Sequence, residues 1–86
     1  MGKKFLIIDD SALMRRAISD IIKENYDDVE ALDTAVNGLE GFDKLVSKPG
    51  YYDLVILDIN MPKMNGLELL EMLQKNRMNE TVVVVS

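Results

Sequence analysis

Two short apolar runs, each ending in aspartate, place the strongest limit on what this chain can fold into. Residues 4–9 run into Asp9, and residues 53–58 run into Asp58. Apolar runs of this length without regular polar interruptions are typical of strands that are buried on both faces of a parallel sheet. Parallel strands need long crossover connections, usually helices, so the sequence between the runs should supply helices.

Helical patterns do lie between the strand-like runs. Residues 11–25 carry apolar side chains about one turn apart, with Arg15 and Arg16 on the polar side. Asn37 and Asn65 each precede a glutamate by three residues, a pattern typical of helix starts, and Pro49-Gly50 indicates a stop. The apolar stripe of the first helix consists of Leu13, Met14, Ala17, Ile18, Ile21 and Ile22.

Two further strands complete the predicted order. Residues 29–35 indicate a weaker strand near a sheet edge, and residues 81–86 form a β-branched run with four successive valines. The order is therefore β-α-β-α-β-α-β, which predicts an α/β protein: a doubly wound parallel sheet with helices on both faces. No linker or repeat divides residues 1–86, so we expect one domain.

Charge and composition exclude several functions. The net charge of −5 argues against binding to nucleic acid or to an anionic membrane surface, because both attract basic faces. The chain has no cysteine and no histidine, which excludes thiolate and imidazole metal sites and histidine-based triads. No signal peptide is visible, and a reducing compartment fits, so we expect a cytoplasmic protein.

Acidic side chains follow the predicted strands where ligands of such sheets bind, at the carboxyl ends. Asp9 and Asp10 follow the first strand, Asp58 ends the third, and Ser86 ends the fourth. Three close carboxylates repel one another unless a proton or a cation neutralises them. With oxygen ligands alone, Mg²⁺ is the natural cation, and a carboxylate beside it can accept a phosphoryl group.

Each of these features has an ordinary structural explanation when it is taken alone. The pair Asp9-Asp10 is more often a solvated strand end or a helix cap, and a strand commonly ends in aspartate before a turn. Ser86 alone indicates almost nothing. The functional hypothesis depends on finding these residues together and in this order.

The motifs resemble those of receiver domains of two-component response regulators, which have a flavodoxin-like fold. Residues 5–11 resemble the opening of that domain, residues 55–66 its phosphorylation segment, and residues 82–86 the strand that ends in the family's serine or threonine. The resemblance covers all 86 residues. Residues 10–15 are most similar to chemotaxis-type receivers.

The resemblance implies a role for each candidate site residue. Asp58 would accept a phosphoryl group from the phosphohistidine of a sensor histidine kinase or a phosphotransfer protein. Asp10 would bind Mg²⁺ directly, Asp9 directly or through water, and Asn60 through its backbone carbonyl. The Asn60 side chain would also tune hydrolysis, and Ser86 would hydrogen-bond the phosphoryl group and report its presence.

The family pattern continues beyond Ser86 with a helix, a fifth strand that carries a lysine, and a final helix. We therefore expect a receiver truncated after the fourth strand, with impaired phosphorylation. The alternative is a phosphorylation-incompetent fragment that binds a partner or itself. Exposure of the Val82–Val85 strand predicts a homodimer through that edge.

An enzyme of the haloacid dehalogenase type is a further alternative, because such phosphatases also use an aspartate nucleophile. Those enzymes carry a second aspartate two residues later as the acid–base group. Here that position is Asn60, which cannot transfer protons, so this alternative is disfavoured.

Overall fold

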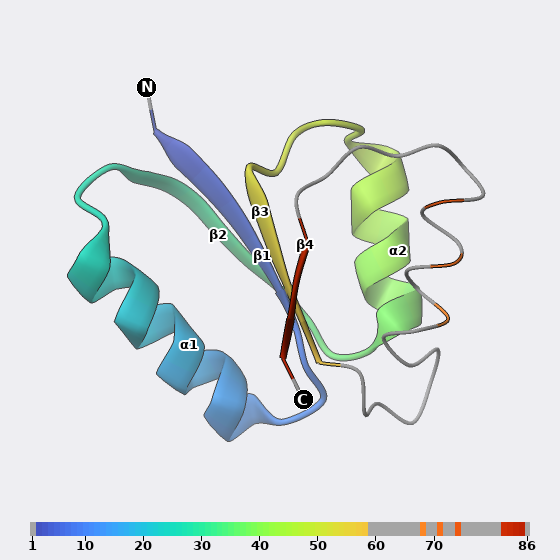
Figure 1. Ribbon diagram of the computed structural model, residues 1–86, viewed down its shortest axis with the longest axis horizontal. Helices are drawn as coiled ribbons and strands as arrows, with labels where there is room; N and C mark the ends of the chain where they lie inside the picture. The colour runs from blue at the N-terminus through green and yellow to red at the C-terminus, as the bar shows by residue number, and fades with distance from the viewer. Residues whose placement is uncertain (1, 59–67, 69–70, 72–73, 75–81, 86) are drawn as a thin grey trace.

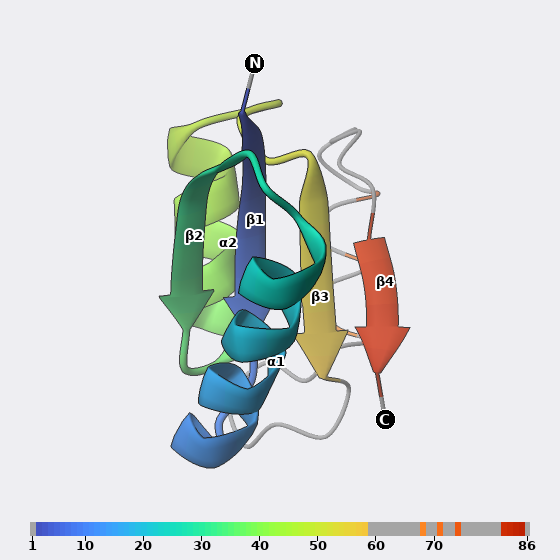
Figure 2. The same ribbon diagram turned by 90° about the vertical axis from the view of Figure 1, so that its left-hand side faces the viewer.

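The sheet of this protein is parallel, as the sequence predicts. The structure, a computed structural model, describes residues 2–58, 68, 71, 74 and 82–85. Its strands are β1 (Lys3–Ile8), β2 (Val29–Ala35), β3 (Leu54–Asp58) and β4 (Val82–Val85). They lie side by side in the order β2-β1-β3-β4 (Figure 2), and each neighbouring pair is parallel.

The central position of β1 explains its continuous apolar sequence. Phe5 to Ile8 are at most 1% exposed, because neighbouring strands flank β1 and side chains cover both of its faces. Leu6 and Ile8 belong to one buried cluster with Leu57, whereas Phe5 and Ile7 belong to another. The alternation of side chains along a strand sends the two sets to opposite faces.

The two described helices lie on opposite sides of the sheet (Figure 1), which gives the predicted doubly wound arrangement. They are α1 (Ala12–Asn25) and α2 (Gly38–Ser47). The Ser11 side chain accepts a hydrogen bond from the Met14 N–H, and the Asn37 side chain accepts one from the Glu40 N–H. The predicted helix start at Asn37 is therefore confirmed, because its side chain satisfies an otherwise unpaired amide of the first turn. The first helix begins where the pattern of residues 11–25 predicts, with Ser11 as its cap. The predicted start at Asn65 lies outside the described residues.

The apolar stripe of α1 is wider than the surface it buries. Ile18 and Ile22 pack on the cluster that contains Phe5, but Leu13 is 78% exposed and Ile21 is 58% exposed. The six-residue stripe therefore does not act as one buried face. A single helix lying on a sheet covers only part of a wide stripe, so the other half remains uncovered among the described residues.

The helix α2 packs closely on β1 at Gly41. A Cβ atom at this position would lie 2.4 Å from Cδ1 and 2.8 Å from Cγ1 of Ile8, both shorter than a real contact allows. Glycine therefore lets α2 rest directly on the strand residue that precedes Asp9. This packing holds the end of β1 in place from the α2 side.

Other predictions concern the sheet edge and the last third of the chain. The weaker strand β2 is at an edge, as predicted. The predicted third helix lies largely outside the described residues, although its members Glu68, Glu71 and Gln74 have helical backbone and are exposed. Within the described part of the chain, no helix is both long enough and apolar enough to cross a membrane.

Candidate functional site

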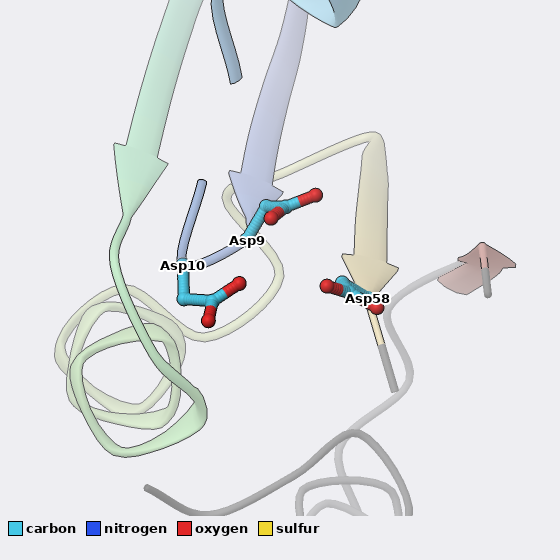
Figure 3. Close-up of side chains that lie close together, drawn as sticks. All are labelled: Asp9, Asp10 and Asp58. Atoms are coloured by element: carbon cyan, nitrogen blue, oxygen red, sulfur yellow. The ribbon is translucent and has the colours of Figure 1, made fainter. Parts of the chain in front are cut away.

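Three aspartates meet at the carboxyl edge of the sheet. Asp9 and Asp10 directly follow β1, and Asp58 is the last residue of the adjacent strand β3. Because the strands are parallel with Ile8 opposite Leu57, both chain segments leave the sheet at the same level. Each aspartate offers a carboxylate oxygen, and these three oxygens lie within 4.8 Å of one another (Figure 3).

The three carboxylates differ in their contact with solvent. Asp9 is 5% exposed, Asp58 is half-buried and Asp10 is exposed. Burial raises the pKa of Asp9 above its ordinary value, and the nearby charges of Asp58 and Asp10 raise it further. A hydrogen bond from the Ser11 amide opposes this effect by stabilising the ionised carboxylate.

The turn between β1 and α1 orients the first two aspartates. The Asp9 N–H donates to the Ala35 carbonyl, which extends the hydrogen bonding of β1 with β2 by one residue. One carboxylate oxygen of Asp9 then accepts from the Ser11 N–H at 2.9 Å. Asp9 is thereby held inward while the chain turns into the helix, and the Asp10 side chain is left at the solvent-facing edge of the cluster.

The donor chemistry of this cluster fits Mg²⁺. Its ligand atoms are carboxylate oxygens, and the chain has no cysteine or histidine that would favour a softer metal. Mg²⁺ commonly binds one or two carboxylates and keeps several waters, and an exposed rim such as that at Asp10 allows this. A divalent cation would also relieve the repulsion among the three carboxylates.

The structure brings together three of the five candidate site residues predicted from the sequence. Asp9, Asp10 and Asp58 converge as expected, and the two other candidates, Asn60 and Ser86, lie outside the described residues. The strand that leads to Ser86 is described, and its Val85 pairs with Asp58. The fourth strand therefore runs toward the same edge of the sheet as the aspartates.

Sequence reasoning missed Arg15, which it assigned to the polar face of α1. Arg15 is half-buried, and its guanidinium Nη1 donates to the backbone carbonyl of Asp9 at 2.7 Å. The position of Arg15 in the first turn of α1 could have indicated this contact. Helical side chains lean toward the helix N-terminus, so an arginine there can reach back to the preceding turn.

Comparison with known proteins agrees with this arrangement. Residues 5–86 match the response regulator receiver domain family. The chain is 42% identical over 84 residues to a protein-glutamate methylesterase/protein-glutamine glutaminase of Clostridium acetobutylicum, covering 96% of this chain and 23% of that protein. It is 41% identical to the chemotaxis protein CheY of Thermotoga maritima, covering 100% of this chain and 68% of that protein.

A solved structure gives the same fold. The response regulator protein TrrA of Thermotoga maritima, in complex with Mg²⁺-BeF, superimposes with a TM-score of 0.80 at 35% identity, covering 95% of this chain and 67% of that one. The chain spans about a quarter or less of the methylesterases it resembles and 56–68% of two CheY proteins. The esterase and glutaminase activities belong to those longer relatives, whereas the matched region is a regulatory domain.

These matches also decide against the haloacid dehalogenase alternative. The sequence match covers nearly the whole chain, and the fold and the placement of the aspartates agree with it. The chain belongs to the response regulator receiver domain family, the phosphoacceptor signalling domains of two-component systems.

Proposed function

We propose that Asp58 is the phosphoacceptor of this receiver domain and that Asp9, Asp10 and Asp58 hold the Mg²⁺ that assists the transfer. The observation that carries the proposal is the approach of three carboxylate oxygens to within 4.8 Å at the ends of β1 and β3. Asp58 is the half-buried member and ends β3, whereas the other two follow β1. Its position lets one carboxylate react while the Asp9-Asp10 pair supplies ligands.

The proposed transfer is a displacement at phosphorus. A carboxylate oxygen of Asp58 forms a bond to the phosphorus of a phosphohistidine, and the phosphorus–nitrogen bond breaks. Its electron pair returns to the imidazole of the donor, which takes up a proton, and the product is an aspartyl phosphate. Mg²⁺, when bound, supplies positive charge that offsets the repulsion between the carboxylate and the incoming phosphoryl oxygens.

The proposed chemistry requires a phosphohistidine donor. The donor is a sensor histidine kinase or a phosphotransfer protein, and the proposed setting is the cytoplasm. The chemotaxis relatives support signalling of the chemotaxis type. The Mg²⁺ in the TrrA complex supports the choice of metal. Asn60 completes the proposed site as a ligand through its carbonyl, and Ser86 as a donor to the phosphoryl group.

Intact-mass measurement with a small phosphodonor tests this function. In the presence of Mg²⁺, the protein should gain the mass of one phosphoryl group, and chelation of the metal should abolish the gain. Asp58→Asn should remain unmodified, whereas Asp53→Asn, which removes an exposed carboxylate before the same strand, should be modified normally. Labelling that survives Asp58→Asn would refute the assignment.

A second candidate function is self-association through β4. This strand pairs with β3 on one side, and no described strand lies on its other side. The sequence Val82–Val85 has high β-propensity and no charge, which favours pairing with another strand. Exposed Leu13 and Ile21 on α1 supply additional apolar surface. These observations support a homodimer.

The oligomeric state tests self-association independently of the phosphoacceptor function, because phosphorylation alone does not require a dimer. Analytical ultracentrifugation at micromolar concentration should give a dimer for the unmodified chain, and Val83→Lys should shift it toward monomer. A cooperative monomer across that concentration range would rule out self-association. That result would leave the phosphoacceptor function unaffected.

A further inference from the structure

The side chain of Arg15 spans the turn that carries two of the three aspartates. Its guanidinium Nη1 lies 2.7 Å from the carbonyl oxygen of Asp9, six residues earlier in the chain. The side chain is half-buried, although arginine at a helix surface is ordinarily solvated. This contact therefore has a more fixed geometry than a surface charge would have.

The contact of Arg15 is with the backbone carbonyl of Asp9 and not with a carboxylate. Among the described residues, no ion pair joins Arg15 to the carboxylate of Asp9 or of Asp10. An arginine that neutralised a carboxylate directly would compete with a metal for its oxygens. Arg15 instead holds the chain that presents those oxygens.

The bonded carbonyl controls the direction of Asp10. The carbonyl of Asp9 and the N–H of Asp10 belong to one planar peptide unit. A hydrogen bond that holds the carbonyl oxygen therefore also holds the backbone nitrogen and Cα of Asp10. Asp10 is exposed and therefore lacks the packing that holds Asp9. The Arg15 guanidinium therefore restrains the backbone before Asp10, which burial does not hold in place.

Arg15 is itself well anchored in α1. Its N–H donates to the Ser11 carbonyl, and its own carbonyl accepts from the Ser19 hydroxyl at 2.7 Å. Ser11 in turn caps the helix and donates its N–H to Asp9. The turn and the first helical turn thus form one hydrogen-bonded unit, in which Arg15 is the long-range link.

We propose that Arg15 is a positioning residue for the Mg²⁺ site, which acts by holding the peptide between Asp9 and Asp10. The inference rests on the proposed Mg²⁺ function of the three aspartates. A positioning role and a purely electrostatic role of Arg15 predict opposite changes in Mg²⁺ affinity when Arg15 is replaced. Removing a positive charge near a cation site should by itself strengthen Mg²⁺ binding, whereas loss of positioning should weaken it.

The test compares Arg15→Gln with Arg16→Gln by Mg²⁺ titration, monitored by the amide NMR signals of Asp10 and Ser11. Both variants lose the same charge, but Arg16 is exposed, and among the described residues the bond to the Asp9 carbonyl comes from Arg15. Arg15→Gln should weaken Mg²⁺ affinity by about tenfold, the lower end for groups that orient metal ligands. Arg16→Gln should leave the affinity unchanged or slightly increased.

Arg15→Lys and thermal unfolding in metal-free buffer separate positioning from loss of folding. Lysine keeps the charge and can donate to the carbonyl, so it should recover part of the lost affinity. Equal affinity in Arg15→Gln and the wild type, or an equal loss in Arg16→Gln, would overturn this inference alone. Absence of Mg²⁺ binding by the folded wild-type protein would overturn both this inference and the proposed metal function.

Discussion

Asp9 is the residue at which the demands of folding and of the proposed function conflict most strongly. It is 5% exposed, yet it lies beside two other carboxylates. Its pKa is raised chiefly because burial disfavours the charged form. The folded protein therefore holds a carboxylate that would be more stable in water, which is the arrangement expected where a cation is meant to bind.

Replacing Asp9 by asparagine should stabilise the metal-free protein at neutral pH. Asparagine keeps an oxygen that can accept from the Ser11 amide, but it removes a buried charge near Asp10 and Asp58. We expect the free energy of unfolding to rise by about 1 kcal/mol, the lower end of the cost of desolvating a buried polar group. Urea unfolding in the presence of a chelator measures this change.

The pH dependence of that gain follows from the direction of the pKa shift. Because the pKa of Asp9 is higher in the folded state, its ionised form costs stability above the folded pKa. The cost declines as pH falls through that pKa and disappears near the ordinary value of an unfolded aspartate. The advantage of Asp9→Asn should therefore vanish in acid. A stability loss at neutral pH would contradict the account.

Tyr52 illustrates a polar contact with a structural role. Its buried ring belongs to the cluster that contains Leu6, and its hydroxyl donates to a carboxylate oxygen of Asp33 on β2 at 2.6 Å. Burial, together with this hydrogen bond and the Asp33 charge, raises the pKa of Tyr52. The contact joins the segment before β3 to the edge strand.

Tyr52→Phe should therefore lower the free energy of unfolding by about 1–2 kcal/mol, because a hydrogen bond to a charged partner is lost while the ring packing is kept. Chemical denaturation measures the change. Tyr51→Phe, at the neighbouring half-buried tyrosine, is the matched control and should have a smaller effect. Unchanged stability of Tyr52→Phe would show that the Asp33 contact contributes little.

At the scale of elements, the packing of α2 on β1 depends on Gly41. Gly41→Ala gains about 1 kcal/mol in helix propensity but places a methyl group against Ile8. Overpacking of this kind typically lowers the free energy of unfolding by about 1–3 kcal/mol. We expect a net destabilisation of about 1 kcal/mol, with weaker Mg²⁺ binding because Ile8 precedes Asp9.

The control for that prediction is Asp43→Ala, an exposed position of the same helix. This change alters helix propensity without adding an atom near β1, so it should leave stability unchanged or improve it. Thermal unfolding of both variants separates the steric effect from the propensity effect. An increase in stability for Gly41→Ala would show that Ile8 can move aside without cost.

The sequence predicted helix starts better than helix faces. Asn37 caps its helix as expected, because a capping side chain acts on amides within its own turn. Which part of the α1 stripe is buried depends on tertiary packing, and local periodicity does not contain that information. For this reason the exposure of Leu13 emerged only from the structure.

At the scale of the whole molecule, alternating elements sufficed to predict the parallel sheet and the edge where the acids gather. Continuous apolar runs such as Phe5 to Ile8 identify buried strands, and parallel strands bring their carboxyl ends to one edge. The strand order and the depth of each carboxylate could not be predicted, because both depend on contacts between distant segments.

The central claim is that the carboxyl ends of β1 and β3 form a Mg²⁺-dependent phosphoacceptor site centred on Asp58. Its most direct test is to trap the acyl phosphate by borohydride reduction after treatment with a phosphodonor and Mg²⁺, and to map the modified residue by peptide mass spectrometry. The account predicts reduction at Asp58 alone, with loss of the signal in Asp10→Asn. Modification at another carboxylate, or an unmodified Asp58 in the folded protein, would contradict it.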